Sequence, residues 1–226
     1  MKMNFLLLIV IIVSVNINSA AQQSVNPVQK TEIAAASYGI VVDNSNSLRY
    51  ALDAVIQTTQ NLVARNNSND ETFLVRFINR DKIQRLQDFT QDPQKISDAA
   101  ENFYTEGGQT AIIDALYQSA QYLAENNKAD SPNRRLALIL ISDGEERESR
   151  RKYEELAKLL SEKKITVYTI GFSKQIQKDQ GRKTYEKAAA FLQKLAAETG
   201  GKSYFPETAV DLNNAASEIF AELRKQ

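Results

Sequence analysis

Apolar residues along this 226-residue chain follow two patterns. Some form short continuous runs, typical of strands buried on both faces, and others recur every three or four positions, typical of amphipathic helices. The runs predict strands at 38–42, 71–78, 83–89, 136–141, 165–172 and 202–205. The helical spacing predicts helices at 47–63, 93–103, 110–123, 152–163, 185–199 and 210–225. Strands and helices therefore alternate along most of the chain.

Polar residues and glycines predict where these elements begin and end. Ser47 has the residue type of a helix N-cap, and Thr110 follows Gly107-Gly108 at the start of the third helix. Gly200-Gly201 is a typical helix C-terminus. The short turn at 79–81 joins two strands, which predicts a hairpin and one antiparallel edge strand.

The alternation predicts the fold class. Near-continuous apolar strands separated by helices indicate a three-layer, doubly wound α/β fold of the Rossmann-like type. We expect a mostly parallel sheet of about six strands, one antiparallel edge strand, and helices on both faces. Such sheets bind ligands beyond the carboxyl ends of their strands. Asp43 directly follows the apolar run 38–42, and Asp143 follows the run 136–141 after one serine. The two aspartates would face one crevice if these strands are neighbours.

The amino-terminal residues have the composition of an export signal. Lys2 precedes the apolar run 5–13, and small residues follow at 19–21. We expect a signal peptide at 1–21, a linker at 22–36 and one folded domain at 37–226. The alternative is an uncleaved anchor, although the run is shorter than the roughly 20 residues that span a bilayer. The expected product is exported, periplasmic or secreted in a bacterium, with no stable membrane anchor after cleavage.

Composition removes several kinds of chemistry. The chain has no histidine and no cysteine, which excludes catalytic triads, histidine or thiolate metal sites and disulfides. It has 28 basic and 28 acidic residues; Lys2 is the only charged residue in 1–21, so the cleaved chain has a net charge of −1. This balance gives no electrostatic reason to expect nucleic acid as a partner.

Five oxygen-bearing side chains stand at the ends of predicted elements. They are Asp43, Ser45, Ser47, Thr110 and Asp143. Carboxylates and hydroxyls suit magnesium, manganese or calcium rather than zinc or copper. The two carboxylates would offset the charge of a bound divalent ion, and the neutral hydroxyls would leave it electron-poor, so it would attract an anionic ligand from outside.

Three motifs resemble the von Willebrand factor type A (VWA) domain family. They are Asp-x-Ser-x-Ser at 43–47, Gly-Gly-x-Thr-Ala at 107–111 and Ser-Asp-Gly-Glu at 142–145, and the resemblance spans roughly residues 36–225. It implies a metal ion-dependent adhesion site, with magnesium foremost and manganese or calcium as alternatives. Ser45, Ser47 and Thr110 would bind the ion, and Asp43 and Asp143 would bind it directly or through water. An acidic side chain of a protein partner would complete the shell.

The sequence departs from the family pattern at a few positions. Asn46 stands where the family usually has glycine, Asn44 is less usual, and Leu48 replaces a common methionine or phenylalanine. Asparagine tolerates left-handed backbone better than most residues, so the loop can still form.

These observations favour a non-enzymatic binding module, and two alternatives stay open. One is a magnesium-dependent phosphotransferase or hydrolase with Asp43 as nucleophile. Haloacid-dehalogenase-like enzymes have a second aspartate two positions on, where this chain has Ser45. The other is a structural domain whose metal site is vestigial.

Overall fold

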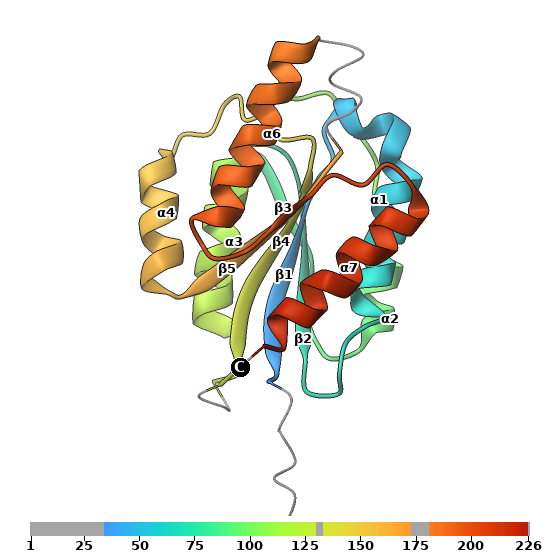
Figure 1. The fold of residues 1–226 in the computed structure, drawn as a ribbon, viewed down its shortest axis with the longest axis vertical. Helices are drawn as coiled ribbons and strands as arrows, with labels where there is room; N and C mark the ends of the chain where they lie inside the picture. Colours follow the sequence, from blue (N-terminus) through green and yellow to red (C-terminus); the bar gives the residue numbers. More distant parts are fainter. Residues whose placement is uncertain (1–33, 130–132, 173–180, 226) are drawn as a thin grey trace, which may run out of the picture. The chain divides into compact units, whose positions relative to one another are not determined.

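The chain folds around a six-stranded sheet, which a computed structural model describes for residues 34–129, 133–172 and 181–225 (Figure 1). The strands are β1 (Ala36–Asp43), β2 (Glu71–Asn79), β3 (Lys82–Thr90), β4 (Arg135–Ser142), β5 (Ile165–Gly171) and β6 (Ser203–Tyr204). Their order is β3-β2-β1-β4-β5-β6, and only the β2–β3 pair is antiparallel. The predicted mixed sheet with one antiparallel edge strand is confirmed.

Helices cover both faces of this sheet. The short 3₁₀ helix η1 (Asn46–Ala51) precedes α1 (Leu52–Val63), and the other helices are α2 (Pro93–Ala100), α3 (Ile112–Asn126), α4 (Tyr153–Glu162), α6 (Arg182–Ala197) and α7 (Ala209–Leu223). Figure 1 shows α1, α2 and α7 on one side and α3, α4 and α6 on the other. The predicted three-layer, doubly wound α/β fold is confirmed.

Alternation along β1 divides the core into two apolar clusters. Ile40 and Val42 pack with residues of α1, α2 and α7, whereas Val41 packs with residues of α3, α4 and α6. All eight residues of β1 are buried. This two-sided burial explains why the central strands are continuous apolar runs rather than alternating ones.

Two predicted helix starts are wrong in detail. Ser47 lies inside η1, and Ser45 occupies the N-cap position without a capping hydrogen bond from its side chain. Thr110 precedes α3, which begins at Ile112. Ser47 is thus part of a helical turn and Thr110 is part of the segment before α3, so neither is a helix cap.

The strand order reverses between β1 and β4. From β1 the chain moves through α1 to β2 on one side, and through α3 it returns to β4 on the other side of β1. Since the connecting helices cover opposite faces, this is the position at which open α/β sheets bind ligands. The two most apolar strands are therefore neighbours, as the shared crevice requires.

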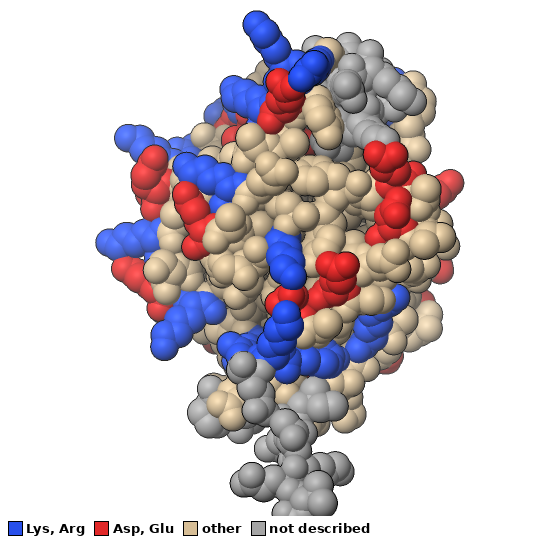
Figure 2. All heavy atoms as spheres, in the orientation of Figure 1, with Lys and Arg blue, Asp and Glu red and all other residues tan. Residues whose placement is uncertain are grey.

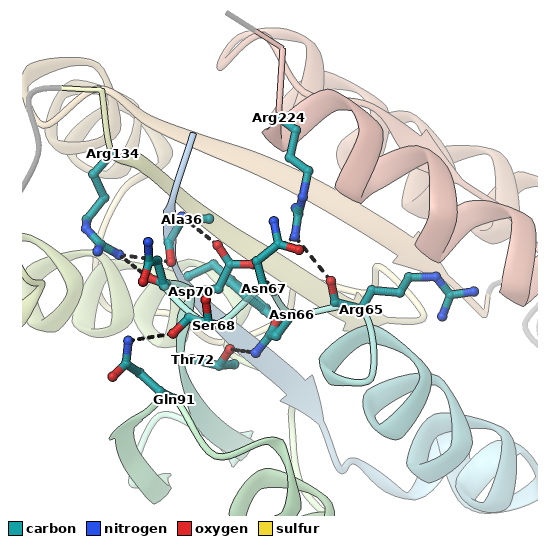
Figure 3. A network of polar contacts seen from close by, with 12 residues as sticks. Ala36, Arg65, Asn66, Asn67, Ser68, Asp70, Thr72, Gln91, Arg134 and Arg224 are labelled. Atoms are coloured by element: carbon teal, nitrogen blue, oxygen red, sulfur yellow. Dashed lines mark hydrogen bonds and ion pairs between the residues drawn. The ribbon is translucent and has the colours of Figure 1, made fainter. Parts of the chain in front are cut away.

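The opposite end of β1 is closed by a polar network around Asp70 (Figure 3). Asp70 Oδ1 accepts a 2.9 Å hydrogen bond from the Ala36 backbone N–H. Its Oδ2 accepts from the Asn67 N–H at 2.7 Å and from Arg224 Nη2 at 2.8 Å. This network connects the start of β1 to the α1–β2 turn and to the end of α7.

Within the described ranges, no helix is both long and apolar enough to cross a bilayer. The expected signal peptide at 1–21 and most of the expected linker lie outside those ranges.

Candidate metal centre

The two predicted aspartates lie at the ends of neighbouring strands. Asp43 is the last residue of β1, and Asp143 directly follows Ser142, the last residue of β4. The register pairs Val42 with Ile141, so the two strands end side by side. These ends point to the top of Figure 1.

Neutral groups hold the Asp43 carboxylate. Its Oδ1 accepts a 2.9 Å hydrogen bond from the Ser45 backbone N–H, and its Oδ2 accepts a 2.7 Å hydrogen bond from the Ser142 hydroxyl. Ser142 belongs to the Ser-Asp-Gly-Glu motif, but nothing in the sequence beyond its place beside Asp143 indicated this contact. The contact joins the ends of β1 and β4.

The loop after β1 is fixed by its backbone and by Asn44. The Asn44 N–H donates to the Phe77 carbonyl at 2.8 Å, and its carbonyl accepts from the Glu106 N–H at 3.1 Å. Its side-chain Nδ2 donates to the Tyr104 carbonyl at 2.8 Å. This loop carries Ser45 and Ser47, whose hydroxyl oxygens lie 2.9 Å apart. The unusual asparagine therefore ties the serine-bearing loop to the segment before Thr110.

Thr110 is connected to the loop that follows Asp143. It is buried, and its carbonyl accepts hydrogen bonds from the Arg147 N–H at 2.9 Å and the Glu148 N–H at 3.3 Å. The predicted ligands thus come from three loops that are hydrogen-bonded to one another.

Two acidic residues outside the predicted set fix the 144–152 loop on α3. Glu146 Oε2 accepts a 2.9 Å hydrogen bond from the Ile113 N–H. The Asp114 carboxylate accepts from the Arg150 and Arg151 N–H groups at 2.8 and 3.0 Å. Sequence reasoning missed these roles because the partners are 33 to 37 positions apart.

Gly144 allows this loop to leave β4. Its φ is +87°, and a Cβ there would lie 2.7 Å from the Ala188 carbonyl oxygen. Only glycine adopts that conformation without strain and fits that space. The loop can therefore turn sharply right after Asp143.

Neither aspartate of the pair forms an ion pair within the described ranges, and Arg147 only slightly offsets the effect of burial on the pKa of Asp143. Burial, followed by repulsion from Asp143, raises the pKa of Asp43 to about 7. Burial also raises the pKa of Asp143, against a lowering effect of the Ser47 hydroxyl. Asp143 Oδ1 accepts from the Glu145 N–H at 3.0 Å, but its buried Oδ2 has no hydrogen-bond partner. Two buried carboxylates with an unpartnered oxygen fit a divalent cation, because such a cation would compensate both charges.

The donor set is rich in hydroxyls and poor in carboxylates. Among the described residues, no three histidine, cysteine, aspartate or glutamate side chains form a group that could hold a metal. This finding fits the residues here, since only two of the five predicted ligands are acidic and the other three are serine or threonine.

The protein surface around the sheet carries both charge signs. In the face drawn in Figure 2, lysine and arginine side chains are interspersed with aspartate and glutamate. This face therefore has no extended basic patch.

Comparison with known proteins identifies the family. The sequence model of the von Willebrand factor type A domain matches residues 39–221, which include all five candidate ligands. The chain belongs to the von Willebrand factor type A domain family. The resemblance seen in the three sequence motifs is thereby confirmed.

Solved structures support the VWA fold. An aerotolerance-related membrane protein from Bacteroides fragilis, solved with multiple mutations to serines, is 21% identical with a TM-score of 0.66; the match covers 84% of this chain and 100% of that chain. The conserved hypothetical protein BatB from Bacteroides thetaiotaomicron is 18% identical over the same shares, with a TM-score of 0.65.

A third structure is the VWA domain of the type V pili tip protein Mfa5 from Porphyromonas gingivalis. It is 15% identical with a TM-score of 0.62, over 86% of this chain and 98% of that chain. At these identities the likeness shows the fold alone. The comparison with curated proteins gives no match.

Proposed function

We propose that this VWA domain is a non-enzymatic module that binds a protein partner through a divalent metal ion. Asp43, Ser45, Ser47, Thr110 and Asp143 would hold the ion, which is magnesium in the first place and manganese or calcium otherwise. The observation that supports this proposal best is the buried Asp43–Asp143 pair. Within the described ranges, neither carboxylate forms an ion pair with a lysine or arginine.

The residues of the site would divide the work. Ser142 and the Ser45 N–H orient the Asp43 carboxylate, and the Glu145 N–H orients Asp143. The three hydroxyls would add neutral, weakly donating ligands, which leave the ion electron-poor although the two carboxylates offset its charge. A bound ion would supply an electron-poor centre that accepts a carboxylate from outside. A glutamate or aspartate of the partner fits that requirement.

The relatives and the amino-terminal composition suggest where the module works. The similar structures come from bacteria, and among them are an aerotolerance-related membrane protein and a type V pili tip protein. Residues 1–21 have the composition of a signal peptide. We therefore propose an exported bacterial protein, periplasmic or secreted, that serves adhesion or the assembly of a complex.

Metal binding is tested by titrating the protein with Mn²⁺ and measuring the concentration of unbound Mn²⁺ by electron paramagnetic resonance. We expect one Mn²⁺ per chain, displaced by excess Mg²⁺. Thr110→Val keeps the side-chain shape but removes the hydroxyl, and should weaken binding about tenfold or more, the usual scale for loss of one such interaction. Thr166→Val, in β5 at the far end of the sheet, is the matched control and should bind normally.

Absence of Mn²⁺ binding by the unaltered chain would contradict the proposal and favour the alternative of a vestigial site. Equal weakening by Thr110→Val and Thr166→Val would show that the loss is not specific to the predicted ligand.

A further inference from the structure

A small pocket opens directly beside the candidate metal centre. It lies between η1, Phe172 and the residues that follow β6, and its volume is about 150 Å³. Most of its lining residues are apolar or aromatic, and the polar ones are Ser47 and Glu207; the full set is Ser47, Leu48, Tyr50, Ala51, Phe172, Pro206 and Glu207. A cavity of roughly this volume can hold a benzene-sized group. The pocket therefore has the size of one large apolar side chain.

Ser47 belongs to both the pocket and the metal centre. Its hydroxyl lies 2.9 Å from that of Ser45 and stabilises the charged form of Asp143. The same residue lines the pocket. When a partner carboxylate is bound at the metal centre, the partner residues next to that carboxylate would therefore lie close to the pocket.

An exposed aromatic side chain stands at the pocket edge. Tyr50 lines the pocket and is 68% exposed. The Arg49 guanidinium lies 4.1 Å from the centre of its ring and donates a 2.6 Å hydrogen bond to its hydroxyl oxygen. Exposed tyrosine and arginine are among the residue types that contribute most to protein interfaces. The pair forms a preformed rim beside the pocket, made of an aromatic ring and a guanidinium.

We propose that this pocket selects the partner, by receiving a leucine- or phenylalanine-sized side chain next to the residue whose carboxylate reaches the metal. This inference rests on the proposed function and names the chemistry of the partner. A second acidic residue would be a poorer occupant, because Glu207 is one of the lining residues and most of the others are apolar. The recognised segment therefore pairs one acid with one large apolar residue.

The test uses three synthetic peptides with blocked ends in saturating Mg²⁺. Their sequences are Gly-Leu-Glu-Leu-Gly, Gly-Ser-Glu-Ser-Gly and Gly-Leu-Gln-Leu-Gly, and binding is followed by NMR titration of the full chain. We expect the Leu-Glu-Leu peptide to bind about tenfold or more tightly than the Ser-Glu-Ser peptide, the usual gain from filling an apolar pocket. The glutamine peptide and the chelator-treated sample should bind at least tenfold more weakly than the Leu-Glu-Leu peptide with Mg²⁺.

Three variants test whether the pocket causes the tighter binding of the leucine peptide. Ala51→Leu fills the space, and should reduce the preference for leucine over serine to less than about twofold. Gln57→Leu adds the same side chain at an exposed position of α1 outside the pocket, and should leave the preference unchanged. Tyr50→Ser removes the exposed rim with little risk to folding, and should reduce the preference about threefold. All three should keep normal Mn²⁺ binding.

The outcomes separate the two proposals. Equal affinity for the leucine and serine peptides, with metal dependence retained, would overturn the pocket and leave the metal-dependent module standing. A leucine preference that survives in Ala51→Leu with normal Mn²⁺ binding would also overturn the pocket. Absence of Mn²⁺ binding by the unaltered chain would instead contradict the proposed function itself.

Discussion

The two ends of the central sheet treat buried aspartates in opposite ways. At the amino end of β1, Asp70 is fully buried and each of its oxygens has a partner, including the Arg224 guanidinium at 2.8 Å. At the carboxyl end, Asp43 and Asp143 are also buried, but their hydrogen-bond donors are neutral and one oxygen has none. Asp70 therefore forms an ion pair with a cation of the chain, whereas neither Asp43 nor Asp143 forms one in the part of the chain that the structure describes.

This difference separates a structural carboxylate from a candidate binding carboxylate. Burying a charge is unfavourable unless it is paired, and Asp70 meets that condition within the chain. The Asp43–Asp143 pair meets it only when a positive ion is supplied from outside. Substitutions at the two ends should consequently change stability in opposite directions.

The largest expected loss of stability is at the amino end of β1, here called the closed end. Asp70→Ala removes an acceptor of three hydrogen bonds and leaves the mostly buried Arg224 without its carboxylate, so it should lower the free energy of unfolding by about 3–5 kcal/mol. Urea unfolding measures this loss. Lys158→Ala, which breaks an exposed ion pair with Glu162, is the control and should cost less than about 1 kcal/mol. Similar losses for both variants would remove the distinction between the two ends.

At the carboxyl end of β1, here called the open end, removing an aspartate charge should raise the free energy of unfolding when no metal is present. Asp43→Asn keeps the shape but removes a charge that burial and Asp143 disfavour. In chelator at pH 8 we expect the variant to be more stable than the unaltered chain by about 1–3 kcal/mol, from 1.36 kcal/mol per pKa unit with allowance for weaker hydrogen bonds. A clear destabilisation in chelator would show that Asp43 supports the fold as Asp70 does.

The gain in stability of Asp43→Asn over the unaltered chain in chelator should depend on pH. The pKa of Asp43 is raised from 3.8 to about 7 in the folded chain, so between these values the folded state holds a proton that the unfolded state has lost. The stability contributed by this proton is complete below about pH 4 and is lost as pH rises through 7. The difference between Asp43→Asn and the unaltered chain in chelator should therefore grow from pH 4 to 7 and then level off. A difference that does not vary with pH would contradict the assigned cause.

A change in stability of similar size, but in the opposite direction, should follow from substituting a glycine in the loop after Asp143. Gly144→Ala forces a side chain into a backbone with φ of +87° and a 2.7 Å approach to the Ala188 carbonyl oxygen, so it should cost about 1–3 kcal/mol. Gly107→Ala is the matched control, because a Cβ there meets no atom within 4 Å. It should change the free energy of unfolding by less than about 0.5 kcal/mol. Equal effects of the two would show that the 144–152 loop is not fixed as described.

Periodicity predicted the fold because both faces of the central strands are buried. Tyr38–Val42 could be recognised as a strand from its own residues, and the adjacency of β1 and β4 completed the crevice for Asp43 and Asp143. Helix starts were less predictable, because serine and threonine suit caps and metal-binding loops equally. Ser47 and Thr110 were therefore placed on the wrong side of those boundaries.

Contacts distant in sequence could not be read from the residues. The Asp70–Arg224 pair joins positions 154 apart, and the Ser142–Asp43 hydrogen bond joins positions 99 apart. Neither residue type nor local spacing distinguishes Asp70 from other turn aspartates. Only the arrangement in space shows which aspartate already has a cation and which does not.

The most direct test of a cation-deficient centre is thermal unfolding of the purified protein with saturating Mg²⁺ or with chelator, beside Asp143→Ala. At 100 times the dissociation constant, binding adds about 2.7 kcal/mol to the folded state, which corresponds to a midpoint rise on the order of 5 °C or more. We expect this rise in the unaltered chain and its loss in Asp143→Ala. An unchanged midpoint with Mg²⁺, Mn²⁺ and Ca²⁺ alike, or an equal rise in Asp143→Ala, would contradict the proposed metal centre.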